Sequence, residues 1–470
     1  MKRLRNNIRL LALGLACLFV GLVAYFSYSV YFYGGRWFAS ATNPRLADQK
    51  QHVIMGDLVD RTGLVLATTD ADGQRSYPQY SDLRRAVSHV VGDSGGVVAN
   101  GAETFMASYL LGFESGAFER LRLLFTGEQA RGDTVRLTID AKLCEYASSL
   151  LSRHEGGAIV VMNYRTGELL CSTSYPDFDP RSLSSVLQNS EDNGALINRV
   201  TQGLYPPGST FKILTLASAL ENISGVMSRT YNCTGALTVD RTTVTEASSQ
   251  VHGVLSVQEA FAESCNTAFA SLALELGYGR LAQTASSFGF GDNFLFRDLI
   301  VYNSQYPTDN QSLDDLAWSG VGQGRVLATP LHMAMVAAAV ANDGVMMEPR
   351  LMLSATTAQG QSRTLQPTRT YRRACSAEIA SALRGAMVAC VQSGTGRQAQ
   401  ISGYTVGGKT GSAESSDDKE IKTHAWFVGF VESDEHPLAI AVVIEHGGSG
   451  GSIATPIAQR VLSRAIEQGY

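Results

Sequence analysis

A serine and a lysine stand three positions apart in the stretch Tyr205-Pro206-Pro207-Gly208-Ser209-Thr210-Phe211-Lys212. On a helix this spacing puts the hydroxyl of Ser209 and the amine of Lys212 on one face, close enough for a proton to pass between them. A serine is a weak nucleophile until a neighbouring base takes its proton, and a lysine removed from water can be neutral enough to do so. The pair is therefore a candidate for covalent acyl transfer.

The residues around this pair predict the helix that must hold it. Pro206 and Pro207 disfavour a helix before them, Gly208 permits a turn, and a helix can begin at about Ser209. From 211 to 220 nearly every residue is apolar, which is typical of a helix buried in a large domain. Ser209 would then sit in the first turn, where free backbone N–H groups can stabilise an oxyanion.

The Ser-x-x-Lys pattern occurs a second time, at Ser416 and Lys419. That copy lies in the polar run 415–420, which is typical of a solvated loop. A short motif is only a hypothesis until its surroundings agree with it. The apolar helix favours the first copy, so Ser209 and Lys212 are the predicted pair.

Two further motifs follow the first in the chain. The second is Ser264-Cys265-Asn266, and the third is Lys409-Thr410-Gly411-Ser412. Neither Ser-x-Asn nor Lys-Thr-Gly occurs anywhere else in the sequence. The order of the three motifs resembles that of penicillin-binding proteins and serine β-lactamases.

The resemblance extends toward the amino terminus. Residues 56–67 contain two apolar runs around an Asp-Arg-x-Gly turn, which predicts a hairpin. This stretch resembles the pedestal signature of class B penicillin-binding proteins, although Met55 and Thr62 replace the family's usual arginine and asparagine. The stretch 175–180 resembles the opening of the family's transpeptidase domain. The chain is therefore identified as similar to class B penicillin-binding proteins over nearly its whole length.

The resemblance implies a role for the residues of the first two motifs. Ser209 would be the nucleophile and Lys212 its general base. Ser264 would relay protons between Lys212 and the leaving amine. Asn266 would help to fix Lys212 and would bind the amide of the substrate.

The third motif would bind substrate. Lys409 and Thr410 would hold a terminal carboxylate, and the backbone N–H of Ser412 would form an oxyanion hole with that of Ser209. Gly411 and the neighbouring glycines leave room for an extended peptide beside the strand.

The first residues carry basic side chains, and no charge follows from Leu10 to Tyr33. This segment is long enough to span a bilayer, which takes roughly 20 apolar residues. A signal peptide cleaved near 39–41 is the alternative, but its apolar region would be shorter, about 7–15 residues. The positive flank predicts a single-pass anchor with the amino terminus in the cytoplasm and the rest of the chain on the outer side. The resemblance implies that the membrane is the bacterial cell membrane and that the outer part is the catalytic domain.

The expected fold class is α+β, in three parts. A basic tail and membrane anchor would occupy 1–33, a small pedestal or dimerisation-like domain 34–133, and a transpeptidase domain 134–470. The resemblance implies that this last part has a central antiparallel sheet flanked by helices and an all-α subdomain. Locally, Asp140 is placed to cap a helix through Leu151.

Composition argues against several other classes. The net charge of −5 gives no reason to expect nucleic acid as a partner. The seven cysteines include no C-x-x-C pair, so neither a disulfide framework nor a metal site is expected. Cys265 is read as a small buried side chain or, less simply, a reactive thiol. The resemblance implies no metal and no organic cofactor.

The function implied by the resemblance is peptidoglycan D,D-transpeptidation. Ser209 would attack D-Ala-D-Ala of a stem peptide, release D-alanine and pass the acyl group to a neighbouring amine; β-lactams would acylate the same serine. Residues 34–133 are too few for a glycosyltransferase domain, which implies a polytopic membrane glycosyltransferase as partner, with cell-wall elongation or division proteins. The alternatives are a carboxypeptidase or β-lactamase, and a non-catalytic scaffold or β-lactam sensor.

Overall fold

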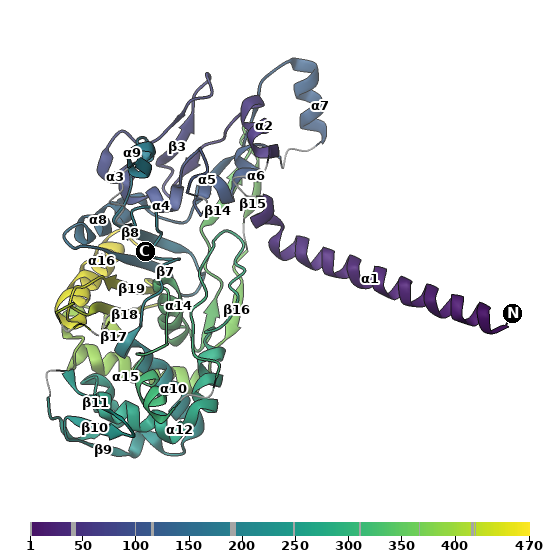
Figure 1. Cartoon of the computed structure of the whole chain (residues 1–470). Helices are drawn as coiled ribbons and strands as arrows, with labels where there is room; N and C mark the ends of the chain where they lie inside the picture. Colours follow the sequence, from purple (N-terminus) through teal and green to yellow (C-terminus); the bar gives the residue numbers. More distant parts are fainter. Residues whose placement is uncertain are drawn as a thin grey trace.

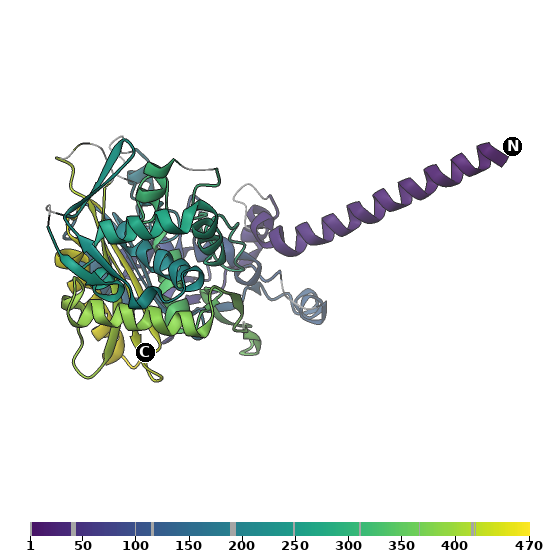
Figure 2. The same ribbon diagram turned by 90° about the horizontal axis from the view of Figure 1, so that it is seen from below.

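The computed structural model describes residues 2–38, 44–98, 100–113, 117–188, 194–247, 250–309, 312–365, 367–414, 418 and 420–470. The body is elongated, with the residues expected to form the pedestal at one end and α10 (Lys212–Asn222) and α12 (Asn266–Ser287) at the other (Figure 1). A single long helix stands away from this body. The view from below shows the same separation (Figure 2).

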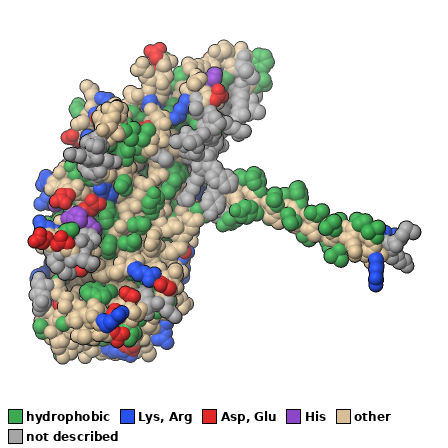
Figure 3. All heavy atoms as spheres, in the orientation of Figure 1, with side chains coloured by type: hydrophobic (Ala, Val, Ile, Leu, Met, Phe, Trp, Pro, Cys, Tyr) green, Lys and Arg blue, Asp and Glu red, His purple; other side chains and the backbone are tan. Residues whose placement is uncertain are grey.

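The projecting helix is α1 (Lys2–Phe38), which runs a little beyond the apolar segment expected from the sequence. Its segment Arg3–Val30 has a mean hydropathy of 2.3, is not buried within the protein, and is long and apolar enough to cross a membrane. Hydrophobic side chains cover much of its visible surface (Figure 3). These features are consistent with a single-pass anchor. The alternative cleavage site near 39–41 lies outside the described residues.

The pedestal is built on a six-stranded sheet in the order β15-β14-β6-β2-β3-β4. The antiparallel pairing of β2 and β3 confirms the hairpin expected at 56–67. Three of the six strands come from beyond residue 133, so the sheet joins both sides of the expected boundary, and a division there stays a prediction. The strands are β2 (Leu58–Val59), β3 (Val65–Thr69), β4 (Arg75–Ser76), β6 (Thr134–Leu137), β14 (Met352–Thr356) and β15 (Ser362–Leu365).

Short elements surround this sheet, and a buried ion pair lies among them. Arg75 Nε donates to Glu103 Oε1 at 2.8 Å, with both side chains nearly inaccessible to water. The surrounding elements are α2 (Pro44–His52), β1 (Val53–Ile54), α3 (Ser81–Ala86), α4 (Ser88–Val91), α5 (Ala102–Phe105), α6 (Ala107–Leu110), α7 (Ala117–Thr126) and β5 (Ala130–Arg131).

The second sheet has five antiparallel strands in the order β17-β18-β19-β7-β8, which confirms the central antiparallel sheet. Its strands are β7 (Gly157–Asn163), β8 (Leu169–Tyr175), β17 (Thr405–Ala413), β18 (His424–Glu432) and β19 (Leu438–Ile444). Helices α8 (Ala141–Leu151) and α16 (Thr455–Glu467) pack on one face, and α14 (Pro330–Ala341) and α15 (Ala377–Gln392) on the other. Because both faces are covered, nearly every residue of these strands is buried.

The remaining part is mainly helical, with α10 (Lys212–Asn222), α11 (Val257–Ala262), α12 (Asn266–Ser287) and α13 (Leu313–Ser319). It is not all-α, because two small sheets lie beside these helices. Strand β9 (Thr230–Cys233) pairs with β12 (Gly253–Ser256), and β10 (Ala236–Val239) with β11 (Thr242–Thr245). The threonine-rich composition of 230–245 explains the difference, since β-branched residues favour strands.

Candidate active site

A tight turn carries Ser209. The 3₁₀ turn Gly208–Phe211 leads directly into α10, so the helical path starts slightly earlier than predicted. Gly208 has a φ of +54°, a conformation that favours glycine, and its N–H donates to Gly322 O at 2.9 Å. Trp426 Nε1 donates to Pro206 O at 3.1 Å. The backbone before Ser209 is thus bonded to strand β18 of the five-stranded sheet and to the loop that contains Gly322.

Helix α10 is buried from Lys212 to Ala219, as the apolar run predicted. The Lys212 side chain is fully buried, and its Nζ contacts Ser264 O at 2.6 Å, Ser264 Oγ at 3.3 Å and Asn266 Oδ1 at 2.7 Å. Burial, and then the charge of Lys409, hold the pKa of Lys212 well below its ordinary value. This shift favours the neutral amine, which is the form that a general base requires.

No hydrogen bond joins Lys212 Nζ to Ser209 Oγ within the described part of the chain. The first motif therefore places Ser209 and Lys212 in adjoining helical turns. The hydrogen-bond partners of the Lys212 amine come from the second motif. Hydrogen bonds between catalytic groups often tighten only when substrate is bound. Proton transfer from Ser209 to Lys212 stays a proposal, taken up below.

The second motif is a break between two helices, α11 and α12. Ser264 adopts a φ of +61° between α11 and α12, and a non-glycine residue in this region is uncommon. Cys265 is the N-cap of α12 and is fully buried. The turn directs the Ser264 hydroxyl and the Asn266 amide oxygen toward the same amine, that of Lys212.

Glu246 supports this turn and was not predicted from the sequence. Its buried carboxylate accepts the N–H of Asn266 at 2.8 Å and that of Thr267 at 2.7 Å, so it satisfies two free donors at the start of α12. Burial alone would raise the pKa of Glu246, but these N–H groups, together with the Cys265 thiol and the charge of Lys212, outweigh that effect and lower it. No motif marks this residue, which lies well before Asn266 in the irregular connection that follows β11.

The third motif lies on the edge strand β17. Lys409 is fully buried, its Nζ contacts Thr410 O at 3.1 Å, and burial lowers its pKa to about 8. Thr410 Oγ1 lies 2.6 Å from the hydroxyl of Thr395, which belongs to the loop after α15. Lys409 therefore stands behind the strand, while Thr410 faces the open side with Thr395.

The three motifs converge on one cleft of about 910 Å³. Its lining includes Ser209, Ser264, Asn266, Thr410, Gly411 and Ser412. The buried amines of Lys212 and Lys409 lie behind this lining. Neither Ser416 nor Lys419, the two residues of the second Ser-x-x-Lys copy, is among the described residues. The structure thus gathers residues that lie far apart in the sequence, from Ser209 to Ser412.

Comparison with known proteins identifies the family. The family model described as "Penicillin binding protein transpeptidase domain" matches residues 157–463, which is more than half of the chain. The chain belongs to the penicillin-binding protein transpeptidase family. Within this family the peptidoglycan D,D-transpeptidase PbpA of Mycolicibacterium smegmatis is 30% identical over 99% of this chain and 100% of its own length. The peptidoglycan D,D-transpeptidase MrdA of Acinetobacter baumannii is 30% identical over 72% of this chain and 55% of its own.

Solved structures agree with this assignment and place the chain among class B penicillin-binding proteins. Penicillin-binding protein A of Mycobacterium tuberculosis, solved as a ceftriaxone acyl-enzyme complex, has a TM-score of 0.81 at 27% identity and covers 89% of this chain and 99% of its own. The D,D-transpeptidase domain of a peptidoglycan glycosyltransferase from Eggerthella lenta has a TM-score of 0.77 at 31% identity, with coverage of 89% and 99%. The penicillin-binding transpeptidase fold is therefore confirmed.

Proposed function

We propose that this chain is a peptidoglycan D,D-transpeptidase that uses Ser209 as its nucleophile. The observation that carries the proposal is that Ser209 lines a cleft together with the second motif, to which the buried amine of Lys212, whose pKa is lowered by burial, is hydrogen-bonded. A member of the penicillin-binding transpeptidase family with this arrangement has the parts that acyl transfer requires: a nucleophile, a base and a proton relay.

The acylation step follows from these positions. Ser209 Oγ attacks the carbonyl carbon of the D-Ala-D-Ala bond while its proton passes to Lys212 Nζ. The N–H groups of Ser209 and Ser412 stabilise the oxyanion. The carbon–nitrogen bond then breaks, the departing D-alanine amine takes a proton from Ser264 Oγ, and Lys212 returns its proton to Ser264. The product is an ester on Ser209.

The second half of the reaction reverses this route with another amine. The amine of a neighbouring stem peptide attacks the ester carbonyl, its proton leaves through Ser264 and Lys212, and Ser209 recovers its hydroxyl proton. A β-lactam enters the same first step, but its amide bond is part of a ring, so the amine stays tethered. The ester then persists.

The cleft also supplies places for the donor peptide. The free edge of β17 can pair with an extended peptide, as in strand addition. Thr410 faces the open cleft and Lys409 contributes charge from behind the strand, so together they suit the terminal carboxylate. Asn266 accepts from Lys212 through Oδ1 and donates to Thr245 O through Nδ2 at 2.8 Å. It is therefore held rigidly beside the position proposed for the substrate amide.

The anchor sets the proposed location. Helix α1 would cross the cell membrane once, with its basic first residues in the cytoplasm and the catalytic cleft outside. Glycan strands would be polymerised by a partner, a polytopic membrane glycosyltransferase, acting with elongation or division proteins. The division of the chain into anchor, pedestal and transpeptidase parts belongs to the same proposal.

The full-length chain in detergent can be tested by D-amino-acid exchange. A stem pentapeptide ending in D-Ala-D-Ala is incubated with excess D-methionine, and products are separated by mass. The expected result is a peptide ending in D-methionine, in excess over the hydrolysed tetrapeptide. Ser209→Ala should abolish this product, and Ser416→Ala should retain it. Hydrolysis alone would indicate a carboxypeptidase, and no turnover by the native chain would favour a scaffold.

A further inference from the structure

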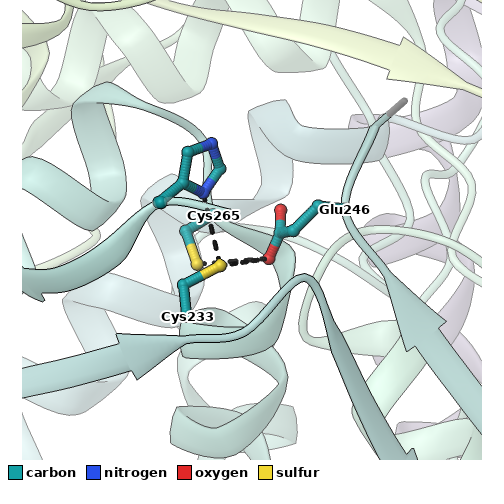
Figure 4. Close-up of side chains that lie close together, drawn as sticks. Cys233, Glu246 and Cys265 are labelled. Atoms are coloured by element: carbon teal, nitrogen blue, oxygen red, sulfur yellow. Dashed lines mark hydrogen bonds between the residues drawn. The ribbon is translucent and has the colours of Figure 1, made fainter. Parts of the chain in front are cut away.

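Four potential metal ligands meet behind the second motif. One side-chain atom from each of Cys233, Glu246, His252 and Cys265 lies within 4.8 Å of those of the other three. Figure 4 shows both thiols and the carboxylate directed toward one point. Cys233 Sγ lies 3.5 Å from Glu246 Oε1 and 3.4 Å from His252 Nδ1, and Cys265 Sγ lies 3.2 Å from Glu246 Oε1.

These atoms have the types and the spacing of a zinc site. Zinc binds thiolates, imidazole nitrogen and carboxylate oxygen, with four ligands in structural sites. At ordinary zinc–ligand bond lengths, the atoms of a tetrahedral set lie about 3.3–3.8 Å apart. Three contacts, between 3.2 Å and 3.5 Å, are already close to this spacing, and because all four ligand atoms lie within 4.8 Å of one another, the set can close around one ion by side-chain shifts.

Each ligand comes from the end of a different element, which fixes its direction. Cys233 ends β9, Glu246 follows β11, His252 precedes β12 and Cys265 caps α12. No sequence motif marks the cluster, because its two cysteines are well separated in the chain and form no C-x-x-C pair. Glu246 and His252 also line the catalytic cleft, which provides a path for an ion to enter.

We infer that Cys233, Glu246, His252 and Cys265 bind one zinc ion, and that this ion positions the Ser264–Asn266 turn. Binding exchanges the two thiol protons for the metal, so both sulfurs become thiolates. Glu246 contributes one negative charge before binding. After binding, two thiolates, one carboxylate and Zn²⁺ again sum to one negative charge. The net charge of the cluster near Lys212 is therefore unchanged.

The positioning effect follows from the two oxygens of Glu246. Oε1 faces the thiols and accepts the N–H of Thr267 at 2.7 Å, so its remaining lone pair would take the metal, while Oε2 accepts the N–H of Asn266 at 2.8 Å. Cys265 lies between Ser264 and Asn266 in the chain, so a metal bond to its sulfur would hold the turn from the other side. Both restraints act on the groups that contact Lys212. This part of the inference rests on the proposed function; metal binding itself does not.

Metal content is the direct test. The full-length chain, purified without chelators or a metal-affinity tag, is assayed by elemental mass spectrometry. We expect about one zinc per chain in the native protein and in Cys375→Ser, a matched cysteine control remote from the cluster. The double variant Cys233→Ser, His252→Ala should retain less than about one tenth of this content. Replacing zinc with Co²⁺ in the native chain should produce a thiolate-to-cobalt absorption band.

Two results would overturn the metal site: a native chain with neither zinc nor a cobalt band, or a Cys233–Cys265 disulfide in the unreduced protein. Positioning is tested separately. Chelation should slow acylation by penicillin about 10- to 100-fold, with recovery on adding zinc. Zinc binding with unchanged acylation would remove the positioning role. A native chain that binds zinc but never reacts with penicillin would count against the proposed function while leaving the metal site intact.

Discussion

The two walls of the cleft are held in place by different means. The wall made by Ser209 and β17 depends on backbone contacts: Gly208 N–H bonds to Gly322 O, and β17 is paired along its length with β18. The wall made by the Ser264–Asn266 turn depends on side chains, chiefly the Glu246 carboxylate at the start of α12. The turn has backbone bonds of its own, from Ser264 N–H to Phe261 O and from Cys265 N–H to Ala260 O, but the N–H groups of Asn266 and Thr267 depend on that carboxylate.

This difference explains which supports a sequence motif can reveal. Backbone support depends on local composition, such as the glycines that lie within or beside the motifs themselves. Side-chain support comes from anywhere the fold brings near. We therefore expect the second wall to be the more sensitive to substitutions outside the motifs.

Lys212 joins the two walls, so its loss should have the largest effect among these predictions. Lys212→Met should lower the rate of acylation by penicillin by about 10²- to 10⁴-fold, because the general base is gone. The second-order rate constant of adduct formation measures this effect. Lys142→Met, at an exposed lysine paired with Glu145, is the control and should react normally. A native-like rate of acylation for Lys212→Met would contradict the assignment of Lys212 as the general base. It would also show that the two walls of the cleft do not act through this lysine.

The side-chain wall can be broken at Glu246. Glu246→Ala leaves the N–H groups of Asn266 and Thr267 without their acceptor, so we expect acylation about 10- to 100-fold slower. The effect should appear in the rate of acylation with the native fold retained, as circular dichroism can check. Glu275→Ala, which removes an exposed carboxylate paired with Arg229, is the matched control. Equal effects of the two substitutions would contradict the special role of Glu246.

The backbone wall can be probed through pH. Since burial lowers the pKa of Lys409 to about 8, its ammonium is present below that pH and is lost as pH rises through it. Acylation by carboxylate-bearing substrates should therefore decline above about pH 8. Lys409→Arg keeps the charge, because arginine does not deprotonate in this range, and should remove the decline. A decline of the same midpoint in Lys409→Arg would assign it to another group.

The pedestal should matter least for the chemistry. Glu103→Ala leaves the buried guanidinium of Arg75 without its carboxylate and should lower the free energy of unfolding by about 3–5 kcal/mol. The acylation rate at a temperature where the variant is folded should stay within about twofold, because this pair lies outside the cleft. Denaturant unfolding and adduct kinetics on the same sample measure both quantities. A large loss of rate in the folded variant would show that the pedestal communicates with the cleft.

The features that could be predicted from the sequence are those whose signals are local. The hairpin at 56–67 and the helix capped by Asp140 are found where turn and capping residues placed them. The antiparallel sheet that carries the Lys-Thr-Gly motif was implied by the resemblance. The convergence of the three motifs was predicted from resemblance. Their spacing alone does not fix which elements meet.

Other features depend on distant pairing and could not be predicted. Strands β14 and β15 join the pedestal sheet although most of the transpeptidase part separates them from β2 in the sequence. Glu246 acquires its role only when β11 is placed beside α12. Of the two small sheets in the helical part, β10 and β11 form a local hairpin, whereas β9 pairs with β12 across the intervening residues.

The site of penicillin attachment tests the central claim most directly. The full-length chain is treated with penicillin G, digested, and the modified peptide is sequenced by mass spectrometry. The account predicts one long-lived adduct on Ser209, absent from Ser209→Ala and unchanged in Ser416→Ala. A stable adduct on Ser264 or Ser416, or an adduct that persists in Ser209→Ala, would contradict it.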